Sequence, residues 1–139
     1  MANDDTVDDL LDAETIVVVG CSRSPEKDAH RIPKYLNEHG YRIVPINPHA
    51  ESILGETSYD RLTDVPEEIE IDVVDVFRPS EAVPNIIEDA LSRRDEVGDV
   101  QGIWLQLGIR NDEAAASAES AGIAVVQDRC MKIEHGRRR

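Results

Sequence analysis

The stretch Thr15-Ile-Val-Val-Val-Gly-Cys-Ser-Arg-Ser-Pro25 runs from apolar residues into a glycine and small polar residues. The apolar part predicts a strand of the buried type, and the chain then leads toward a helix. A turn of this kind presents backbone N–H groups and a helix N-terminus to an anion, most often the phosphates of a nucleotide. The stretch therefore predicts a nucleotide-binding loop at residues 20–24.

Strand and helix signals alternate along the rest of the chain. Strands are predicted at residues 15–20, 41–46, 71–77, 100–105 and 123–126. Helices are predicted at about residues 28–39, 80–94 and 112–121, with short ones at 5–13 and 129–134. This alternation is typical of an α/β fold with a Rossmann-like, doubly wound, parallel five-stranded sheet and helices on both faces.

The strand order is expected to be 3-2-1-4-5, by analogy with dinucleotide-binding folds. In that order the winding reverses between the first and the fourth strand, and ligands lie at the carboxyl ends of those two strands. The loops at residues 20–24 and 106–108 would then face one another across a crevice.

The length of 139 residues is suited to one domain, which we expect at residues 15–135. Residues 1–14 form an acidic segment or a short helix in this division, and residues 136–139 form a basic tail with a disordered end. No apolar run approaches the roughly 20 residues of a membrane span, and the acidic start lacks the pattern of a signal peptide. We therefore expect a soluble, cytoplasmic protein that does not bind a membrane.

The formal net charge of −14 argues against nucleic-acid binding, because neutralising phosphates requires a basic face. One interpretation of the acidity is a solvated, self-repelling surface that keeps the protein in solution. The other is adaptation to high salt, which would screen that repulsion. A homodimer is the expected assembly, since symmetric dimers are common among oligomers.

Other ligand classes find less support in the sequence. A nicotinamide dinucleotide would require GxGxxG after the first strand and an acidic residue after the second, but only Gly20 is present and Asn47-Pro48 replaces the acid. A receiver domain would require an acidic pair at the end of the first strand to hold magnesium. Residues 17–19 are all valine, so no such pair is present. The four histidines show no spacing of metal ligands or of a catalytic triad, so no metal site and no catalytic residue are predicted.

Several motifs along residues 15–135 resemble those of a known family. They are Gly20-Cys-Ser22 with Pro25, Tyr35-Leu36, Gly40-Tyr41, Pro45-Ile-Asn47-Pro48, Ile53-Leu54-Gly55, Phe77-Arg78, Trp104-Leu-Gln106-Leu-Gly108-Ile and Asp128-Arg-Cys130-Met-Lys-Ile-Glu134-His. In this order the motifs resemble the small single-domain CoA-binding proteins. That family is similar to the N-terminal CoA-binding domain of the succinyl-CoA synthetase α-subunit.

The resemblance implies a set of cofactor-binding residues. The loop of Gly20, Cys21, Ser22, Arg23 and Ser24 would receive the phosphates; Asn47, Pro48, Phe77 and Arg78 would line the nucleotide side; Gln106 and Leu107 would contact the pantetheine or the adenine. The residue types agree, because Gly20 allows close approach and the serine hydroxyls can donate hydrogen bonds. Arg23, Lys27, Arg31 or Arg78 can neutralise phosphate charge, and Arg78 is the preferred cation.

Structural alternatives stay open for single residues. Gly20 would only permit a tight turn, Ser22 would cap the following helix, Arg78 would form a surface ion pair, Pro48 would end its strand, and Phe77 and Trp104 would belong to the core. Cys21 and Cys130 lack CxxC spacing and an activating base, which favours buried, inert cysteines over a mixed disulfide with the CoA thiol.

The expected function is non-catalytic binding of coenzyme A or an acyl-CoA. In the synthetase relatives the chemistry depends on a phosphohistidine in a separate domain, so no ligase activity is expected of these residues alone. Two alternatives remain: a small NAD-type-dependent oxidoreductase, and a subunit of a larger complex that its ligand only stabilises.

Overall fold

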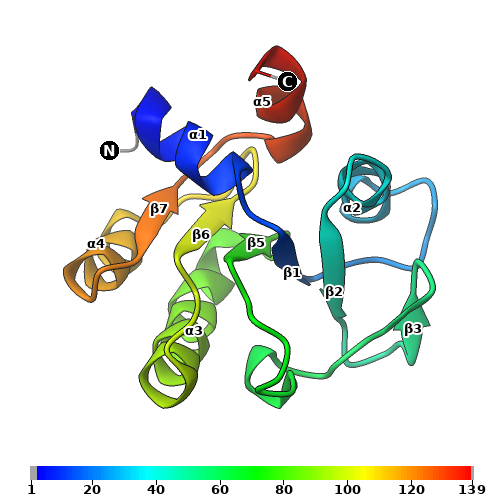
Figure 1. Ribbon diagram of the computed structural model, residues 1–139, viewed down its shortest axis with the longest axis horizontal. Helices are drawn as coiled ribbons and strands as arrows, with labels where there is room; N and C mark the ends of the chain where they lie inside the picture. The colour runs from blue at the N-terminus through cyan, green and yellow to red at the C-terminus, as the bar shows by residue number, and fades with distance from the viewer. Residues whose placement is uncertain (1–2, 139) are drawn as a thin grey trace.

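A computed structural model describes residues 3–138 of the chain. Its centre is a parallel sheet of five strands (Figure 1). The strands are β1 (Thr15–Val19), β2 (Arg42–Ile46), β5 (Val73–Val76), β6 (Gly102–Leu105) and β7 (Ala124–Val126). A small antiparallel hairpin of β3 (Ser52–Ile53) and β4 (Glu56–Thr57) follows β2. The predicted α/β class, with a Rossmann-like, doubly wound sheet, is confirmed.

The strand order differs from the predicted one. The order is β2-β1-β5-β6-β7, so β5, the third of the five predicted strands, lies between β1 and β6 and separates the first strand from the fourth. All four residues of β5 are at most 1% exposed, which suits a central strand. The winding therefore reverses between β1 and β5, and the ligand crevice is expected at the carboxyl ends of those two strands.

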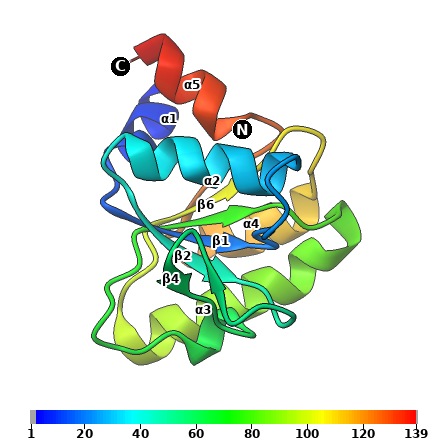
Figure 2. The same ribbon diagram turned by 90° about the vertical axis from the view of Figure 1, so that its right-hand side faces the viewer.

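Helices cover both faces of the sheet (Figures 1 and 2). One face carries α1 (Asp4–Leu11), α2 (Asp28–Glu38) and α5 (Met131–Arg138), and the other carries α3 (Val83–Val97) and α4 (Asp112–Ser120). Two 3-10 turns, Leu62–Asp64 and Ser80–Ala82, lie before β5 and α3. None of the helices in the described part of the chain is long and apolar enough to cross a membrane.

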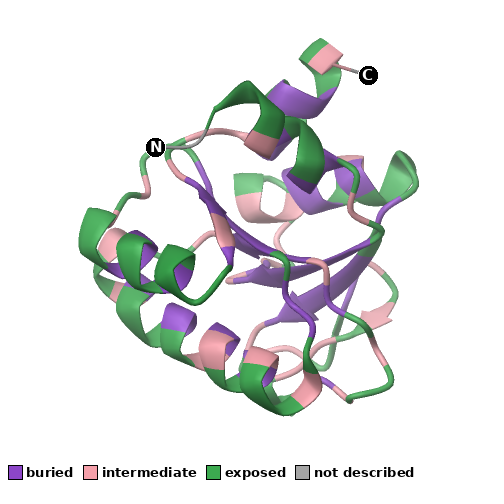
Figure 3. Ribbon diagram, turned by 60° about the vertical axis from the view of Figure 1, so that its left-hand side comes forward, coloured by how far each residue is buried: buried purple, intermediate pink, exposed green. Residues whose placement is uncertain are grey.

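Each face of the sheet has its own apolar core. Ile16, Leu36, Trp104 and Met131 are buried on the side of α2 and α5. Val17, Val74, Ile87 and Ile103 are buried on the side of α3 and α4. Figure 3 shows the central strands mostly buried and the helices exposed on their outer sides. Tight packing on both faces leaves the ends of the strands as the place for a ligand.

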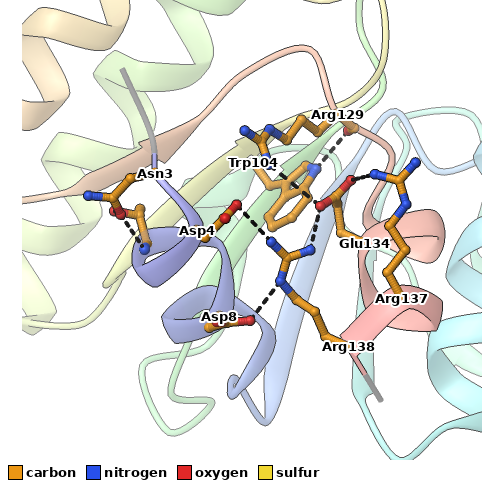
Figure 4. Close-up of polar contacts among 9 residues, drawn as sticks. Asn3, Asp4, Asp8, Trp104, Arg129, Glu134, Arg137 and Arg138 are labelled. Carbon is orange, nitrogen blue, oxygen red and sulfur yellow. Dashed lines mark hydrogen bonds and ion pairs between the residues drawn. The ribbon is translucent and has the colours of Figure 1, made fainter.

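The C-terminal end is more ordered than the sequence predicts. Helix α5 continues through Arg138, where a disordered tail is predicted, and the prediction for Arg139 lies outside the described residues. The Arg138 guanidinium binds the carboxylates of Asp4 at 3.0 Å, Asp8 at 2.7 Å and Glu134 at 2.6 Å (Figure 4). The pairs with Asp4 and Asp8 join α5 to α1, so the first and last helices of the described chain are held together.

Candidate functional site

A crevice opens at the carboxyl ends of β1, β2 and β5. Its cavity has a volume of about 580 Å³. The loop after β1 contributes Gly20, Cys21, Ser22 and Lys27 to the lining, the segment after β2 contributes Asn47 and Pro48, and the segment after β5 contributes Phe77 and Arg78. Eight of the twelve predicted residues thus lie around this one cavity. His49 and Asp60 complete its polar lining.

Gly20 lets two loops approach each other closely. Its φ of +85° lies in the left-handed region, which favours glycine. A Cβ at this position would lie 3.1 Å from Cδ of Arg78 and 3.3 Å from the carbonyl carbon of Phe77. The glycine is therefore required both by the turn and by the side chain of Arg78, which lies against it.

Ser22 shapes the loop rather than capping the next helix. Its Oγ accepts a hydrogen bond from the backbone N–H of Ser24 at 3.0 Å, and its own N–H donates to the carbonyl of Ala29 at 3.0 Å. Helix α2 begins after Lys27, whose side chain makes no capping hydrogen bond. The loop therefore holds its conformation by internal hydrogen bonds.

Asn47 joins the end of β2 to the same loop. Its Nδ2 donates to the carbonyl of Cys21 at 2.9 Å, and its Oδ1 accepts from the N–H of His49 at 2.8 Å. Both ends of the amide are thus occupied by the protein itself. Asn47 therefore lines the crevice and positions the loop. Its amide group is engaged within the protein rather than directed at a ligand.

Two cations at the crevice make no ion pair with a carboxylate of the described residues, although Asp60 also lines the cavity. Arg78 and Lys27 are exposed, and within residues 3–138 no hydrogen bond or ion pair engages the side chain of either one. Arg31, by contrast, is paired with Asp28. In a chain of net charge −14, unpaired cations beside a glycine loop give this crevice a local affinity for anions.

A second cavity adjoins the first, since Phe77 lines both. Its volume is also about 580 Å³, and it contains the predicted residues Gln106 and Leu107. Arg23 and Ser24 line neither cavity. The two predicted loops therefore do not face one another across one crevice, because β5 and Phe77 lie between them. The second cavity also has a wall that the sequence reasoning missed, formed by Cys130, Lys132 and Ile133 around the start of α5.

Asp75 is a buried carboxyl next to the site. It is fully buried, its Oδ1 accepts a hydrogen bond from Nε2 of Gln106 at 2.8 Å, and its Oδ2 has no partner among the described residues. Burial raises the pKa of Asp75 to about 7, although hydrogen bonds from Gln106 and the backbone of Val76 oppose the shift. The signal in the sequence is a single acid inside the valine-rich β5.

The two cysteines lie in different environments, and neither forms a disulfide. Cys21 is fully buried, and its burial, together with the negative charge of Asp75, raises the pKa of the thiol to about 12. Such a thiol carries almost no thiolate near neutral pH. Cys130 is half-buried and lines the second cavity, so it is the more accessible of the two.

The aromatic residues Phe77 and Trp104 have different positions. Trp104 is fully buried, and its Nε1 donates to the carbonyl of Arg129 at 2.8 Å, so it belongs to the core (Figure 4). Phe77 is half-buried and separates the two cavities. Over residues 3–138, no group of three or more His, Cys, Asp or Glu side chains is arranged to hold a metal ion.

Comparisons with known proteins match nearly the whole chain. The family described as "CoA binding domain" matches residues 14–136. The uncharacterized protein YneT of Bacillus subtilis is 33% identical over 126 residues, which are 91% of this chain and 88% of the Bacillus protein. The ADP-forming acetate–CoA ligase II of Archaeoglobus fulgidus is 30% identical over 95 residues, which are 65% of this chain but 14% of the ligase.

Among solved structures too, this chain matches small proteins over nearly their whole length and a large synthetase over a small part of it. A hypothetical protein from Pyrococcus horikoshii is 36% identical with a TM-score of 0.87, and the match covers 98% of this chain and 92% of that one. A protein from Thermus thermophilus is 38% identical with a TM-score of 0.87 and 98% coverage of both chains. The dinucleotide-forming acetyl-coenzyme A synthetase 1 of Korarchaeum cryptofilum is 26% identical with a TM-score of 0.69, over 86% of this chain and 27% of the synthetase.

Proposed function

Because this chain belongs to the family of CoA-binding domains, we propose that the crevice at the ends of β1 and β5 binds coenzyme A or an acyl-CoA without catalysing its conversion. The family match supports coenzyme A binding in general. The residues of the site and the absence of catalysis are our proposal.

The unpaired cations Arg78 and Lys27 beside the Gly20 loop are the observation that carries this proposal. Coenzyme A bears a pyrophosphate and a further phosphate on its ribose, so it presents several negative charges to a protein. Charge-assisted hydrogen bonds from an arginine to phosphate are about twice as strong as neutral ones. The pyrophosphate therefore lies against the loop, where Gly20 allows close approach of the backbone.

The neighbouring cavity receives the other end of the same ligand. The two cavities meet at Phe77, so an extended molecule can occupy both. Gln106 donates one amide hydrogen to Asp75, while no hydrogen bond within the described residues engages its Oε1. This oxygen is available to accept a hydrogen bond from an amide N–H of the pantetheine.

Ligase activity is not part of the proposal. The archaeal acetate–CoA ligase matches this chain over only 14% of its own length, so its activity belongs to the whole ligase. The shared portion corresponds to the cofactor-binding domain, which by itself supplies a site for the ligand.

The test is a titration of the protein with CoA, acetyl-CoA, NAD, NADP and ATP, by calorimetry and by thermal shift, at low and at high salt. We expect CoA to bind most tightly and to raise the midpoint of unfolding, since a ligand of the native state stabilises it. Tighter binding of NAD than of CoA would favour the oxidoreductase, and no binding of CoA would overturn the proposal.

A pair of arginine variants locates the site. Arg78→Ala should weaken CoA binding by about tenfold to a hundredfold, because it removes one or two charge-assisted hydrogen bonds to phosphate. Arg61→Ala removes the same charge from an arginine that pairs with Asp89 and lines neither cavity. It should change the affinity by less than about twofold. Equal effects of both variants would mean that only the overall charge matters.

A further inference from the structure

The second cavity has an exposed apolar rim. Among the large hydrophobic side chains of residues 3–138, Leu107 is 68% exposed and Ile133 is 49% exposed. Both line this cavity, although they come from the loop after β6 and from α5. Neighbouring exposed apolar side chains at a cavity are typical of a binding site, whereas scattered ones are ordinary.

The interior of this cavity continues the apolar surface. Ile32 is buried, Ile109 and Phe77 are half-buried, and each contributes to the lining. The volume of about 580 Å³ falls within the range of roughly 300–1,000 Å³ for small-molecule sites. The shape and the lining thus suit an apolar group that enters past Phe77.

The charged groups of the second cavity have partners, unlike those of the first. Arg31 pairs with Asp28, and the ammonium of Lys132 lies 5.2 Å from the centre of the Tyr35 ring. In the first cavity, Arg78 and Lys27 have no such partners within the described residues. The first cavity is therefore suited to phosphate, and the second is suited to hydrocarbon.

We propose that the second cavity holds the acyl chain of an acyl-CoA thioester, so that the preferred ligand carries an apolar chain of about four or more carbons. This inference rests on the proposed function, because the phosphates at the Gly20 loop direct the thioester end toward Phe77. Leu107 and Ile133 close over the chain and set the preference for its length. A terminal carboxylate on the chain would have to draw the ammonium of Lys132 away from the Tyr35 ring or compete with Asp28 for Arg31.

The experiment is calorimetry of the wild-type protein with CoA, acetyl-CoA, butyryl-CoA, hexanoyl-CoA and succinyl-CoA. Burial of one methylene is worth about a fourfold gain in affinity. Butyryl-CoA, with two more methylenes, should therefore bind about fifteenfold more tightly than acetyl-CoA, and hexanoyl-CoA more tightly still. Succinyl-CoA has the same number of acyl carbons as butyryl-CoA but ends in a carboxylate, and it should bind no better than acetyl-CoA.

Variants at the rim test which residues are responsible. Ile133→Ser should reduce the gain in affinity from acetyl-CoA to butyryl-CoA while leaving the affinity for CoA unchanged. Leu107→Ser should reduce the same gain when each thioester is compared with CoA on the same variant, and Leu107→Met should retain the gain. Both side chains are exposed, so the core is not altered. The melting temperature of each variant checks this.

The outcomes separate the two proposals. If CoA binds and chain length makes no difference, the acyl site is overturned and the proposed function stands. If none of the thioesters and no CoA binds, the proposed function itself fails. If sedimentation shows a dimer that Leu107→Ser dissociates, and chain length has no effect on affinity, a second copy of the chain covers this rim and the acyl site is overturned.

Discussion

Asp99 and Asp75 are buried carboxylates at opposite ends of the sheet, and they differ in how completely they are bonded. Asp99, before β6, accepts hydrogen bonds from Nε of Arg93 at 3.2 Å, from Nη2 of Arg93 at 3.0 Å and from the N–H of Ile71 at 2.9 Å. Asp75, in β5, accepts one side-chain hydrogen bond, from Gln106, and its Oδ2 has no partner among the described residues.

The surroundings of the two carboxylates extend this difference. The guanidinium of Arg93 also donates to the carbonyls of Val65, of Pro66 at 3.2 Å and of Ile69 at 2.7 Å, so the loop before β5 is fastened to α3. In the crevice at the carboxyl ends of the strands, the cations Arg78 and Lys27 lack partners within residues 3–138. One end of the sheet satisfies its polar groups internally, and the other leaves polar groups for a ligand, which is typical of functional sites.

The largest effect is expected from breaking the satisfied pair. Arg93→Met leaves the Asp99 carboxylate buried without its cation, and the free energy of unfolding should fall by about 3–5 kcal/mol. Urea unfolding followed by circular dichroism measures the change. Arg61→Ala, in an exposed ion pair with Asp89, is the control and should have a much smaller effect. Similar losses in both variants would contradict the structural role of the Arg93–Asp99 pair.

The next largest effect concerns the unsatisfied carboxylate and depends on pH. Asp75 has a pKa of about 7 in the folded protein and an ordinary value of 3.8, so between these pH values the folded state holds a proton that the unfolded state has lost. The stability of the wild type should therefore fall as the pH rises from about 4 to about 7. Asp75→Asn removes this dependence, and its advantage over the wild type should grow with pH, to about 4 kcal/mol at most.

Asp99→Asn is the matched comparison for Asp75→Asn. It removes the charge that compensates the buried Arg93, so it should destabilise the protein at pH 8, where Asp75→Asn stabilises it. Urea unfolding of both variants and the wild type at pH 5 and pH 8 measures these differences. If both variants changed the free energy of unfolding in the same direction at pH 8, the distinction between the two ends of the sheet would be wrong.

A third effect is the reactivity of the thiol next to Asp75. Burial and the charge of Asp75 raise the pKa of Cys21 to about 12, whereas Cys130 is half-buried at the second cavity. N-ethylmaleimide at pH 8 should therefore modify Cys21 at least about a hundredfold more slowly than Cys130. Peptide mass spectrometry over time gives both rates. Rapid labelling of Cys21 in the folded protein would show that this end of the sheet is open to solvent.

The smallest effect is expected from salt. With a net charge of −14, raising potassium chloride from low to molar concentration should raise the urea midpoint of the wild type, because screening weakens repulsion at the surface. The difference between the wild type and Arg93→Met should stay nearly constant, since buried pairs are screened much less. A midpoint that does not rise would count against adaptation to high salt.

Much of the fold follows from local patterns in the chain. The apolar run 15–19 predicts β1, and Gly20 with its small polar neighbours predicts a tight loop, because both depend on residues close together in the sequence. The family resemblance, rather than local pattern, implied most of the twelve site residues, and the tertiary structure brings eight of the twelve to one cavity. Their roles in binding remain predictions for the titrations above.

The strand order could not be obtained in this way. The right-handed crossover rule sets the handedness of a connection but not which side of β1 the third strand joins. The analogy with dinucleotide-binding folds put that strand at the edge, whereas β5 pairs with both β1 and β6. This one difference moves the reversal point and divides the predicted crevice into two cavities.

Residue pattern alone was thus enough for the α/β class, the five strands of the main sheet and the glycine loop, since periodicity and backbone freedom act over a few neighbouring residues. The β3–β4 hairpin was not predicted. Three-dimensional packing was needed for the strand order, for the bond between Gln106 and Asp75 across 31 positions, and for the ion pair between Arg138 and Asp4 across 134. These features depend on which distant segments share space, and burial then sets the pKa of a carboxyl that looks ordinary in the sequence.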